Sequence, residues 1–279
     1  MAWALEWRKI LPRMPDWTLL LRSPVFETTA LLMGLVVGSF ANVCIHRLPR
    51  GESVVTPRSR CPACGTRIGA LDNIPVLSFL ALRGRCRRCR ARISPRYPAV
   101  EAANGLLYLV LAARLGPAPR TFVLMAFVTA VLVLGLIDLE HQLLPDVITL
   151  PGIAAGVAAS FLPDSPVTPL GSLLAAALGF GALTAVNLAY RAARGTDGFG
   201  GGDPKMVAMI GAFLGWRGAL LAVFVASVLG SLVGLGLMAF GGRTGRHKLP
   251  LGTFLGLGAL VVIFTGEAVL AWYGGLFRG

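Results

Sequence analysis

The chain has 279 residues, of which 55% are hydrophobic and only 14% are charged, whereas soluble domains carry about 25% charged residues. A soluble core of this size cannot bury so much apolar sequence, and the mean hydropathy is +0.72. The composition therefore excludes an ordinary soluble protein and predicts an all-α polytopic membrane protein.

The formal net charge is +13, and 12 of the 26 Lys and Arg residues lie in one polar segment between Arg47 and Arg96. Aromatic residues do not alternate with these arginines, which argues against a nucleic acid as the partner of this segment. Membrane lipid is the partner that the composition indicates.

The first predicted element in chain order is an N-terminal interfacial segment at 1–25, which contains charged residues, prolines and three tryptophans, Trp3, Trp7 and Trp17. It lacks the compact apolar core of a cleavable signal peptide, and tryptophan is typical of the headgroup region. A first transmembrane helix at 26–46, a polar loop at 47–97 and a transmembrane domain at 98–279 follow it.

The apolar runs predict about eight transmembrane helices, because a spanning helix needs about 20 mostly apolar residues. The predicted spans are 26–46, 98–115, 120–138, 147–162, 169–190, 204–215, 219–240 and 250–273. The sixth is short, and is either a half-span or a continuation into the seventh.

Lysine and arginine predict the orientation, because cytoplasmic loops carry an excess of both. If the loop at 47–97 is cytoplasmic, then the inner loops together with Lys205 hold 18 of the 26 basic residues. The C-terminal end of the third span and the start of the sixth span then lie at the cytoplasmic boundary of the membrane.

Four of the five cysteines form two C-x2-C pairs, Cys61 with Cys64 and Cys86 with Cys89. Two such turns can direct four thiolates at one tetrahedral centre, which predicts a structural zinc site in a small zinc-ribbon-like loop. Two disulfides or a redox-active C-x-x-C remain alternatives, the disulfides being disfavoured in a reducing compartment. Cys44, in the first apolar span, is interpreted as a small buried side chain.

Two acidic positions near span ends need an explanation, because charged residues within spans are costly and are usually functional. Asp138 ends the third span, where its negative charge opposes the helix dipole. Asp203 begins the sixth span, directly after three glycines. Helix capping is an alternative for Asp203, but one glycine would suffice for a cap, and three suit the close approach of an extended peptide.

A pair formed by Asp138 and Asp203 could share one proton, so that the ionised member activates a water and the protonated member polarises a peptide carbonyl. That is the chemistry of an aspartic protease. Asp146 is interpreted as the N-cap of the fourth span. Glu140 and His141 are interpreted as solvated loop residues rather than partners of the pair.

Ordered motifs across the chain resemble the type IV prepilin peptidase family, the leader peptidase/N-methyltransferases. The stretches that carry the resemblance are GSFANVCIHRLPRGES, CPACG, DNIPVLSFLALRGRCRRC, ISPRYPAVE, IDLEHQLLPDVITLP and GGGDPKM. The last contains the G-x-G-D pattern of presenilin-like intramembrane proteases. LPLGTFLG matches the proline-glycine stretch of the family only loosely.

The resemblance implies that Asp138 and Asp203 are the catalytic aspartates and that the substrate is a prepilin or pseudopilin of a type IV pilus or protein secretion system. It implies cleavage of a basic leader peptide at the cytoplasmic face of the inner membrane. It also implies methylation of the new N-terminus with S-adenosylmethionine, because the loop with four cysteines is present. The resemblance assigns no methyl-donor residues.

Two other classes of protein remain as alternatives. A transporter or channel also contains intramembrane acids and broken helices, but it predicts acids near mid-membrane. A zinc-dependent membrane sensor without enzymatic activity would depend on the cysteines and not on Asp203. A metalloprotease is disfavoured, because none of the three histidines lies in an H-E-x-x-H motif.

Overall fold

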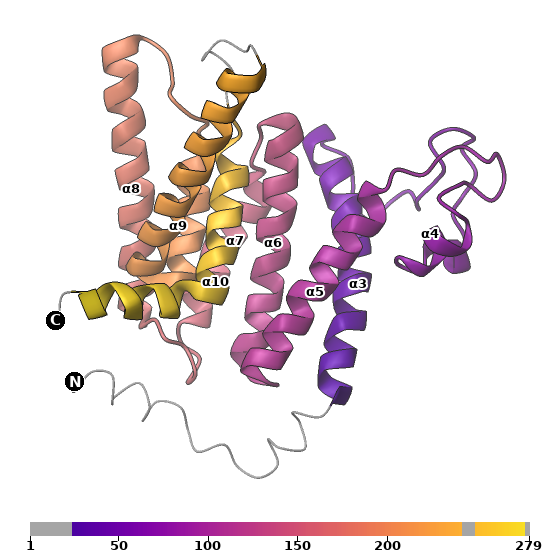
Figure 1. The fold of residues 1–279 in the computed structure, drawn as a ribbon, viewed down its shortest axis with the longest axis horizontal. Helices are drawn as coiled ribbons and strands as arrows, with labels where there is room; N and C mark the ends of the chain where they lie inside the picture. Colours follow the sequence, from indigo (N-terminus) through magenta and orange to yellow (C-terminus); the bar gives the residue numbers. More distant parts are fainter. Residues whose placement is uncertain (1–23, 242–248, 277–279) are drawn as a thin grey trace. The chain divides into compact units, whose positions relative to one another are not determined.

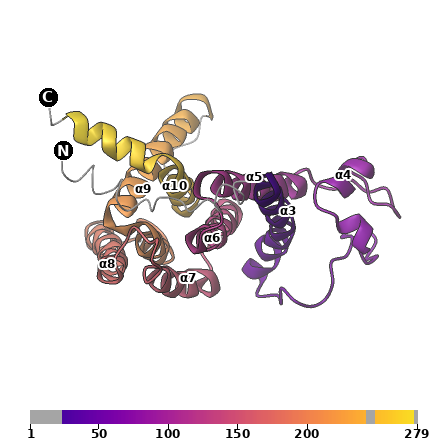
Figure 2. The same ribbon diagram turned by 90° about the horizontal axis from the view of Figure 1, so that it is seen from below.

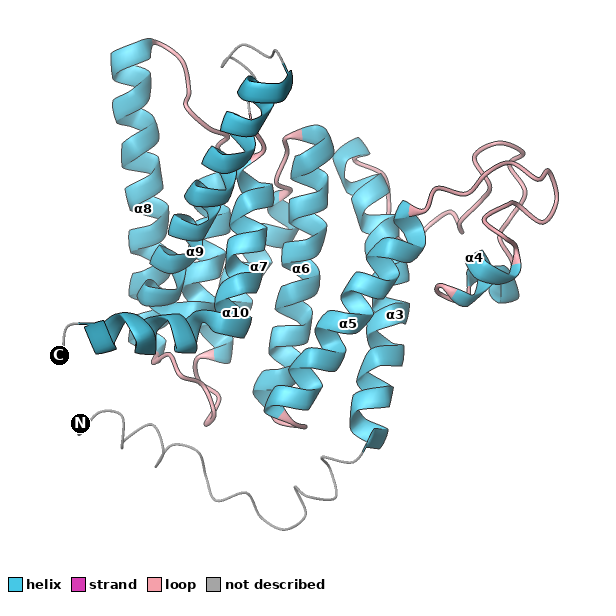
Figure 3. Ribbon diagram, in the orientation of Figure 1, coloured by secondary structure: helices cyan, strands magenta, loops and turns pink. Residues whose placement is uncertain are grey.

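The computed structural model describes residues 24–241 and 249–276, and the regular structure of this part of the chain is helical (Figures 1 and 3). The elements are α3 (Pro24–Arg47), η1 (Leu48–Arg50), η2 (Ala70–Asn73), α4 (Leu77–Ala81), α5 (Arg96–Leu115), α6 (Pro119–His141), α7 (Asp146–Ala159), α8 (Pro169–Arg194), α9 (Asp203–Gly241) and α10 (Leu251–Leu276). The all-α prediction is confirmed. The predicted interfacial segment at 1–25, with its three tryptophans, lies almost entirely outside the described residues.

Five helical stretches of the described residues are long and apolar enough to cross a membrane, so the protein is a multi-pass membrane protein. They are Pro24–Arg50, Arg96–Leu115, Pro119–His141, Pro169–Arg194 and Asp203–Ala239. The apolar helices Asp146–Ala159 and Leu251–Gly266 are shorter. Each predicted span overlaps one of these helices, although the fourth, predicted at 147–162, extends past the end of its helix at Ala159. The predicted number of eight crossings stays a prediction.

Helix α9 contains both the predicted sixth and seventh spans. The two halves meet at Gly215, whose backbone has φ 71° and ψ 177°. Residues with a side chain rarely adopt this conformation, so the helix breaks at the glycine. The sixth span is therefore a short helical segment that continues, after a kink, into the seventh.

The contacts divide the described residues into two compact units, which are 24–40 with 60–125 and 41–59 with 126–241 and 249–276. In the first unit, α3 and α5 approach each other at glycines. A Cβ added to Gly34 would lie 2.8 Å from Cα of Gly105, and Asn104 Nδ2 donates to the carbonyl of Gly34 at 2.8 Å. Small residues and interhelical hydrogen bonds are the usual means of helix association in lipid.

In the second unit, α7, α8 and α10 pack against α9 (Figures 1 and 2). Ala176, Ala208 and Ala212 form a buried cluster, with Ile153 and Val157 packed on it. The Ser172 hydroxyl donates to the Ala212 carbonyl at 2.7 Å, which ties α8 to α9. This packing fixes the first half of α9, the helix that begins with Asp203.

Candidate active site and cysteine cluster

Asp138 lies in the last turn of α6 and is only 5% exposed. The helix ends just beyond it, because Gln142 adopts a left-handed conformation with φ 50°. The Gln142 amide donates to the carbonyl of Asp138 at 2.9 Å, which closes the final turn. The end of an apolar helix thus holds a buried carboxyl group.

Thr253, near the start of α10, holds the Asp138 side chain. Its backbone N–H donates to Oδ2 of Asp138 at 2.9 Å. Its hydroxyl donates to the carbonyl of Gly135 at 2.8 Å and lies 3.4 Å from the same Asp138 oxygen. The orientation of the carboxyl is therefore fixed by a residue that belongs to a different helix.

Asp203 is the first residue of α9 and is also 5% exposed. Its amide donates to the carbonyl of Gly200 at 3.2 Å, so the glycine run turns tightly into the helix. Its Oδ1 is buried and has no hydrogen-bond partner among the residues that the structure describes. A buried oxygen without a partner is costly, which points to a site built for a proton, a water or a substrate group.

Leu144 lies close to Gly202, the neighbour of Asp203 in the chain, and to Gly252, which is close to Asp138. The two aspartates interact electrostatically. A Cβ added to Gly202, just before Asp203, would lie 2.7 Å from Leu144 Cβ. A Cβ added to Gly252 would lie 2.9 Å from Leu144 Cδ2 and 3.0 Å from Asp138 Oδ2. Side chains at these two glycines would therefore displace Leu144, and at Gly252 also the Asp138 carboxyl.

The glycine-rich loop is tied to α8 through Asn187. Its Oδ1 accepts hydrogen bonds from the amides of Gly198 at 2.9 Å and Phe199 at 3.4 Å. The Tyr190 ring lies beside Gly198, 3.1 Å from where a Cβ would be. Asn187 thus anchors the segment that delivers Asp203 to the site.

The interpretation of Asp146 as an N-cap is wrong. The N-cap of α7 is Pro145, and Asp146 is the first helical residue, with its carboxylate 2.7 and 2.8 Å from Nζ of Lys205. This ion pair joins the beginnings of α7 and α9. The ammonium group competes for the carboxylate with the backbone amides that a cap would satisfy.

Glu140 and His141 are exposed at the end of α6, with Oε2 of Glu140 3.9 Å from Nε2 of His141. Their exposure agrees with the interpretation of both as solvated residues. The sequence alone did not identify four residues of the site, namely Leu144, Asn187, Gly252 and Thr253.

The four cysteines form a compact cluster in the first unit, with all four Sγ atoms within 4.8 Å of one another. Cys61 Sγ and Cys89 Sγ are 3.8 Å apart, which matches the edge of about 3.8 Å of a tetrahedron with Zn–S bonds of about 2.3 Å. All of them are free thiols, so the disulfide alternative is not favoured. Cys44 is not a member of this cluster and is half-buried in α3.

Both C-x2-C turns have the same backbone geometry. Cys61 N–H donates to the Thr66 carbonyl and Gly65 N–H to the Cys61 carbonyl, and the second turn repeats this pattern through Cys86, Ala91 and Arg90. Gly65 and Arg90 both have positive φ, 68° and 62°. The two turns are therefore copies of one knuckle geometry.

The pKa values of the cysteine thiols are also consistent with binding of a cation. Hydrogen bonds with the side chain and backbone of Thr66 lower the pKa of Cys64 to about 6. The Ala91 amide acts to lower the pKa of Cys89, but desolvation and hydrogen bonds with the other three thiols raise that pKa to about 11. Four close thiols cannot all ionise unless a positive ion compensates their charge, and structural zinc binds as many as four thiolates.

Glu101 attaches the cysteine-bearing loop to α5. Its Oε2 accepts from the Val76 amide at 2.8 Å, and Val76 has a positive φ of 61°. Positive φ is a genuine outlier for a β-branched residue. The buried carboxylate of Glu101 compensates by satisfying the amide of the strained residue.

The fold and the site together define a multi-pass membrane protein that carries two buried, interacting aspartates at helix ends and a separate four-cysteine cluster. Family models match two adjacent parts of the chain: the bacterial peptidase A24 N-terminal domain at residues 32–115, and the type IV leader peptidase family at residues 125–235. The cysteines lie in the first part and both aspartates in the second.

Curated relatives named prepilin leader peptidase/N-methyltransferase are similar to most of the chain. The protein of Pseudomonas putida is 36% identical over 92% of this chain and 97% of the relative. The protein of Aeromonas salmonicida is 33% identical over 89% of this chain and 94% of the relative. The protein of Myxococcus xanthus is 40% identical over 80% of this chain and 66% of the relative. No solved structure gives a significant match. The chain belongs to the type IV leader peptidase family.

Proposed function

We propose that this protein is an aspartic endopeptidase that removes the leader peptide of prepilins, with Asp138 and Asp203 as its catalytic pair, and that it then methylates the new N-terminus. The observation that carries the proposal is that two buried carboxyl groups, 65 positions apart in the chain, lie at the ends of apolar helices and interact electrostatically. The names of the relatives support the substrate class and the second activity.

The chemistry follows from one proton shared by the pair. The ionised carboxylate accepts a proton from a water as the water oxygen attacks the scissile carbonyl carbon. The protonated carboxyl donates a hydrogen bond to the carbonyl oxygen. Collapse of the tetrahedral intermediate breaks the C–N bond, and the amine leaves with a proton from the pair. The Oδ1 of Asp203, which has no partner in the described part of the chain, and the fixed orientation of Asp138 support these roles. They do not assign which carboxyl is ionised.

Peptide access is supported by the glycines before Asp203. Gly201 has open space where a Cβ would be, so an extended backbone can approach the carboxyl closely. We propose that the site faces the cytoplasm at the inner membrane, because the basic residues concentrate in the loops on that side. A basic leader would be attracted to the acidic groups there.

Zinc and S-adenosylmethionine belong to the same proposal. Cys61, Cys64, Cys86 and Cys89 would hold zinc in a closed site, which orders the loop but has no open position for catalysis. S-adenosylmethionine would supply the methyl group that the freed amine takes up. The support is the geometry of the thiols for zinc, and the methyltransferase in the names of the relatives for the methyl donor.

The test is cleavage of a purified prepilin by the full-length protein in nanodiscs, with and without S-adenosylmethionine. Asp138→Asn and Asp203→Asn should each abolish cleavage, while Glu140→Gln, an exposed acid on the same helix as Asp138, should cleave normally. Methylation in the Asn variants should be tested on a precleaved pilin, and it should persist. Full cleavage by either Asn variant would refute the catalytic pair.

A further inference from the structure

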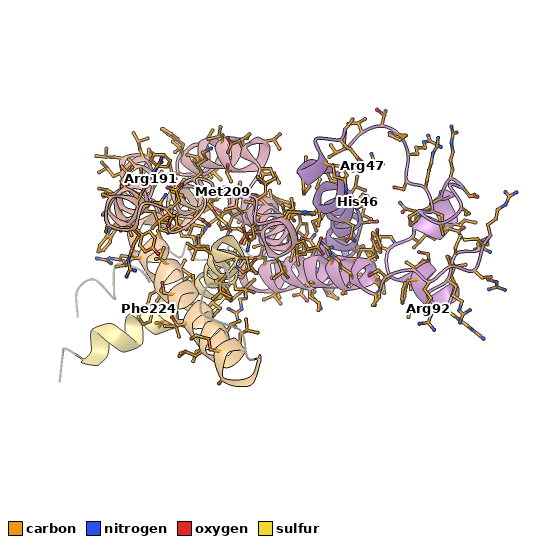
Figure 4. The ribbon with its side chains drawn as sticks, turned by 90° about the horizontal axis from the view of Figure 1, so that it is seen from above. His46, Arg47, Arg92, Arg191, Met209 and Phe224 are labelled. Carbon is orange, nitrogen blue, oxygen red and sulfur yellow. The ribbon has the colours of Figure 1, made fainter. Side chains whose placement is uncertain are left out.

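The segment at 53–95 is strongly and almost uniformly basic. It holds nine arginines, no lysine and a single acid, Asp72, and all nine arginines are exposed. Figure 4 shows nitrogen-tipped side chains extending outward from this loop, including that of Arg92. Asp72 is already engaged by Arg87, whose Nε and Nη2 lie 2.9 and 2.7 Å from its Oδ1. The remaining arginines therefore have no acid within the segment to neutralise them.

The two knuckles bring arginines together in pairs. Arg60 and Arg67 face each other across an antiparallel bridge that closes the first knuckle, and Arg85 and Arg92 do the same in the second. Like charges directly opposite each other on paired backbone segments are destabilising. A bound anion would relieve the repulsion in both pairs.

The same loop exposes apolar side chains. Leu71 and Ile74 are 78% and 41% exposed, and Leu77 and Leu80 are 64% and 63% exposed. Leu71 and Ile74 are three residues apart at the 3-10 helix η2, and Leu77 and Leu80 are three residues apart in the α-helix α4. The two side chains of each pair therefore lie on one side of their helical turn. The two elements, η2 and α4, contact each other. The loop thus combines an apolar patch with surplus positive charge.

Few partners satisfy both features. A basic leader peptide would be repelled by the arginines. Single-stranded nucleic acid is bound through exposed aromatic platforms, and Phe79, the sole aromatic residue in 53–95, lies against Gly84, 3.1 Å from where a Cβ would be. An anionic bilayer surface offers phosphates to arginines and acyl chains to leucines.

Tethering favours the bilayer further. The loop connects α3 and α5, two helices that are apolar and long enough to span the membrane. A binding face that is held beside the bilayer at both ends encounters it at a high effective concentration. Even weak contacts can then keep the loop on the surface.

We propose that Leu71, Ile74, Leu77 and Leu80, together with the two arginine pairs of the knuckles, form a docking face for the phosphate headgroups and acyl boundary of an anionic bilayer. The apolar residues insert at the interface and the arginines bind phosphate. Docking of this kind would set the position of the cysteine-bearing loop on the membrane, and it does not depend on the peptidase activity.

The experiment uses hydrogen–deuterium exchange of the full-length protein in nanodiscs of phosphatidylcholine, with or without phosphatidylglycerol. We expect amides of 70–82 to exchange at least about fivefold more slowly in the anionic discs, with much of this protection lost in high salt. Leu77→Gln with Leu80→Gln should abolish the protection. Val55→Gln, an exposed apolar residue outside the docking face, should retain it.

The double variant Arg85→Gln with Arg92→Gln distinguishes a role of these arginines in membrane binding from a role in folding of the loop. This double variant should lose protection in anionic discs, while the amides of the second knuckle exchange no faster than in the unmodified protein in neutral discs, because like-charge repulsion has been removed. If the amides of the second knuckle exchange faster in the double variant in neutral discs, then these arginines have a structural role. That result would overturn their role in docking. Equal exchange of 70–82 in both kinds of disc, or equal protection by inorganic phosphate in neutral discs, would overturn the docking face itself.

Discussion

Thr253 donates its backbone N–H to the carboxyl of Asp138, a residue 115 positions earlier in the chain. The bond joins the start of α10 to the end of α6. The threonine hydroxyl binds the Gly135 carbonyl, one turn before Asp138 on the same helix. One residue therefore fixes both the aspartate and the helix turn that carries it.

Thr253→Val should reduce kcat for prepilin cleavage by about fivefold with little change in KM. The substitution retains the backbone donor and the side-chain shape but removes the hydroxyl, and a hydrogen bond is worth about 1 kcal/mol. Steady-state kinetics with a prepilin peptide would measure the effect. Thr253→Ser, which restores the hydroxyl, should recover most of the rate, and failure to recover it would assign the loss to packing.

Gly252→Ala should reduce cleavage by about a hundredfold, because small displacements of a catalytic group can cost that much. The new methyl group would lie 3.0 Å from Asp138 Oδ2 and 2.9 Å from Leu144 Cδ2. Gly236→Ala is the matched control, since no atom of the residues that the structure describes lies within 4 Å of a Cβ there. Similar activities in the two variants would show that the Asp138 carboxyl tolerates displacement.

These relationships show where the sequence was informative. The apolar runs predicted the helices well, because a stretch of about 20 apolar residues has few alternatives to a span. Asp138 and Asp203 could be singled out because charge at a span end is costly. The spacing of the cysteines similarly predicted that four thiols would meet, as the cluster now shows.

The residues that support the pair gave no comparable signal. Thr253 and Leu144 are ordinary residues in or beside apolar helices, and their contacts with the site depend on how α6, α9 and α10 pack. Gly252 resembles many other glycines in a chain that has 35 of them. Asp146 satisfied the sequence pattern of an N-cap, and only the three-dimensional approach of Lys205 reveals its ion pair.

Breaking the Asp146–Lys205 ion pair should have a modest effect. The side chains are 54% and 29% exposed, and such pairs contribute at most about 1 kcal/mol. Asp146→Asn and Lys205→Met should each reduce cleavage by no more than about fivefold, and the double variant should be no worse than the more impaired single one. Abolished cleavage in Asp146→Asn with normal cleavage in Asp138→Asn would show that Asp146 is the catalytic acid.

Removal of zinc should unfold the cysteine-bearing loop. We expect one zinc per chain by elemental analysis, and strong chelation or Cys64→Ser should make 58–92 sensitive to trypsin, which has many arginines to cleave there. Cys44→Ser, outside the cluster, should retain both zinc and resistance. A loop that stays resistant after verified loss of zinc would contradict a structural metal.

Asn187→Ala should release the glycine-rich loop and weaken cleavage by about fivefold, the effect of losing about 1 kcal/mol of hydrogen bonding. Its Oδ1 now accepts from the amides of Gly198 and Phe199, so these amides should exchange with deuterium faster in the variant. Asn187→Asp retains an acceptor oxygen and should keep both amides protected. If Asn187→Ala lowers activity without changing exchange at these two amides, then Asn187 acts by some route other than anchoring the loop that leads to Asp203.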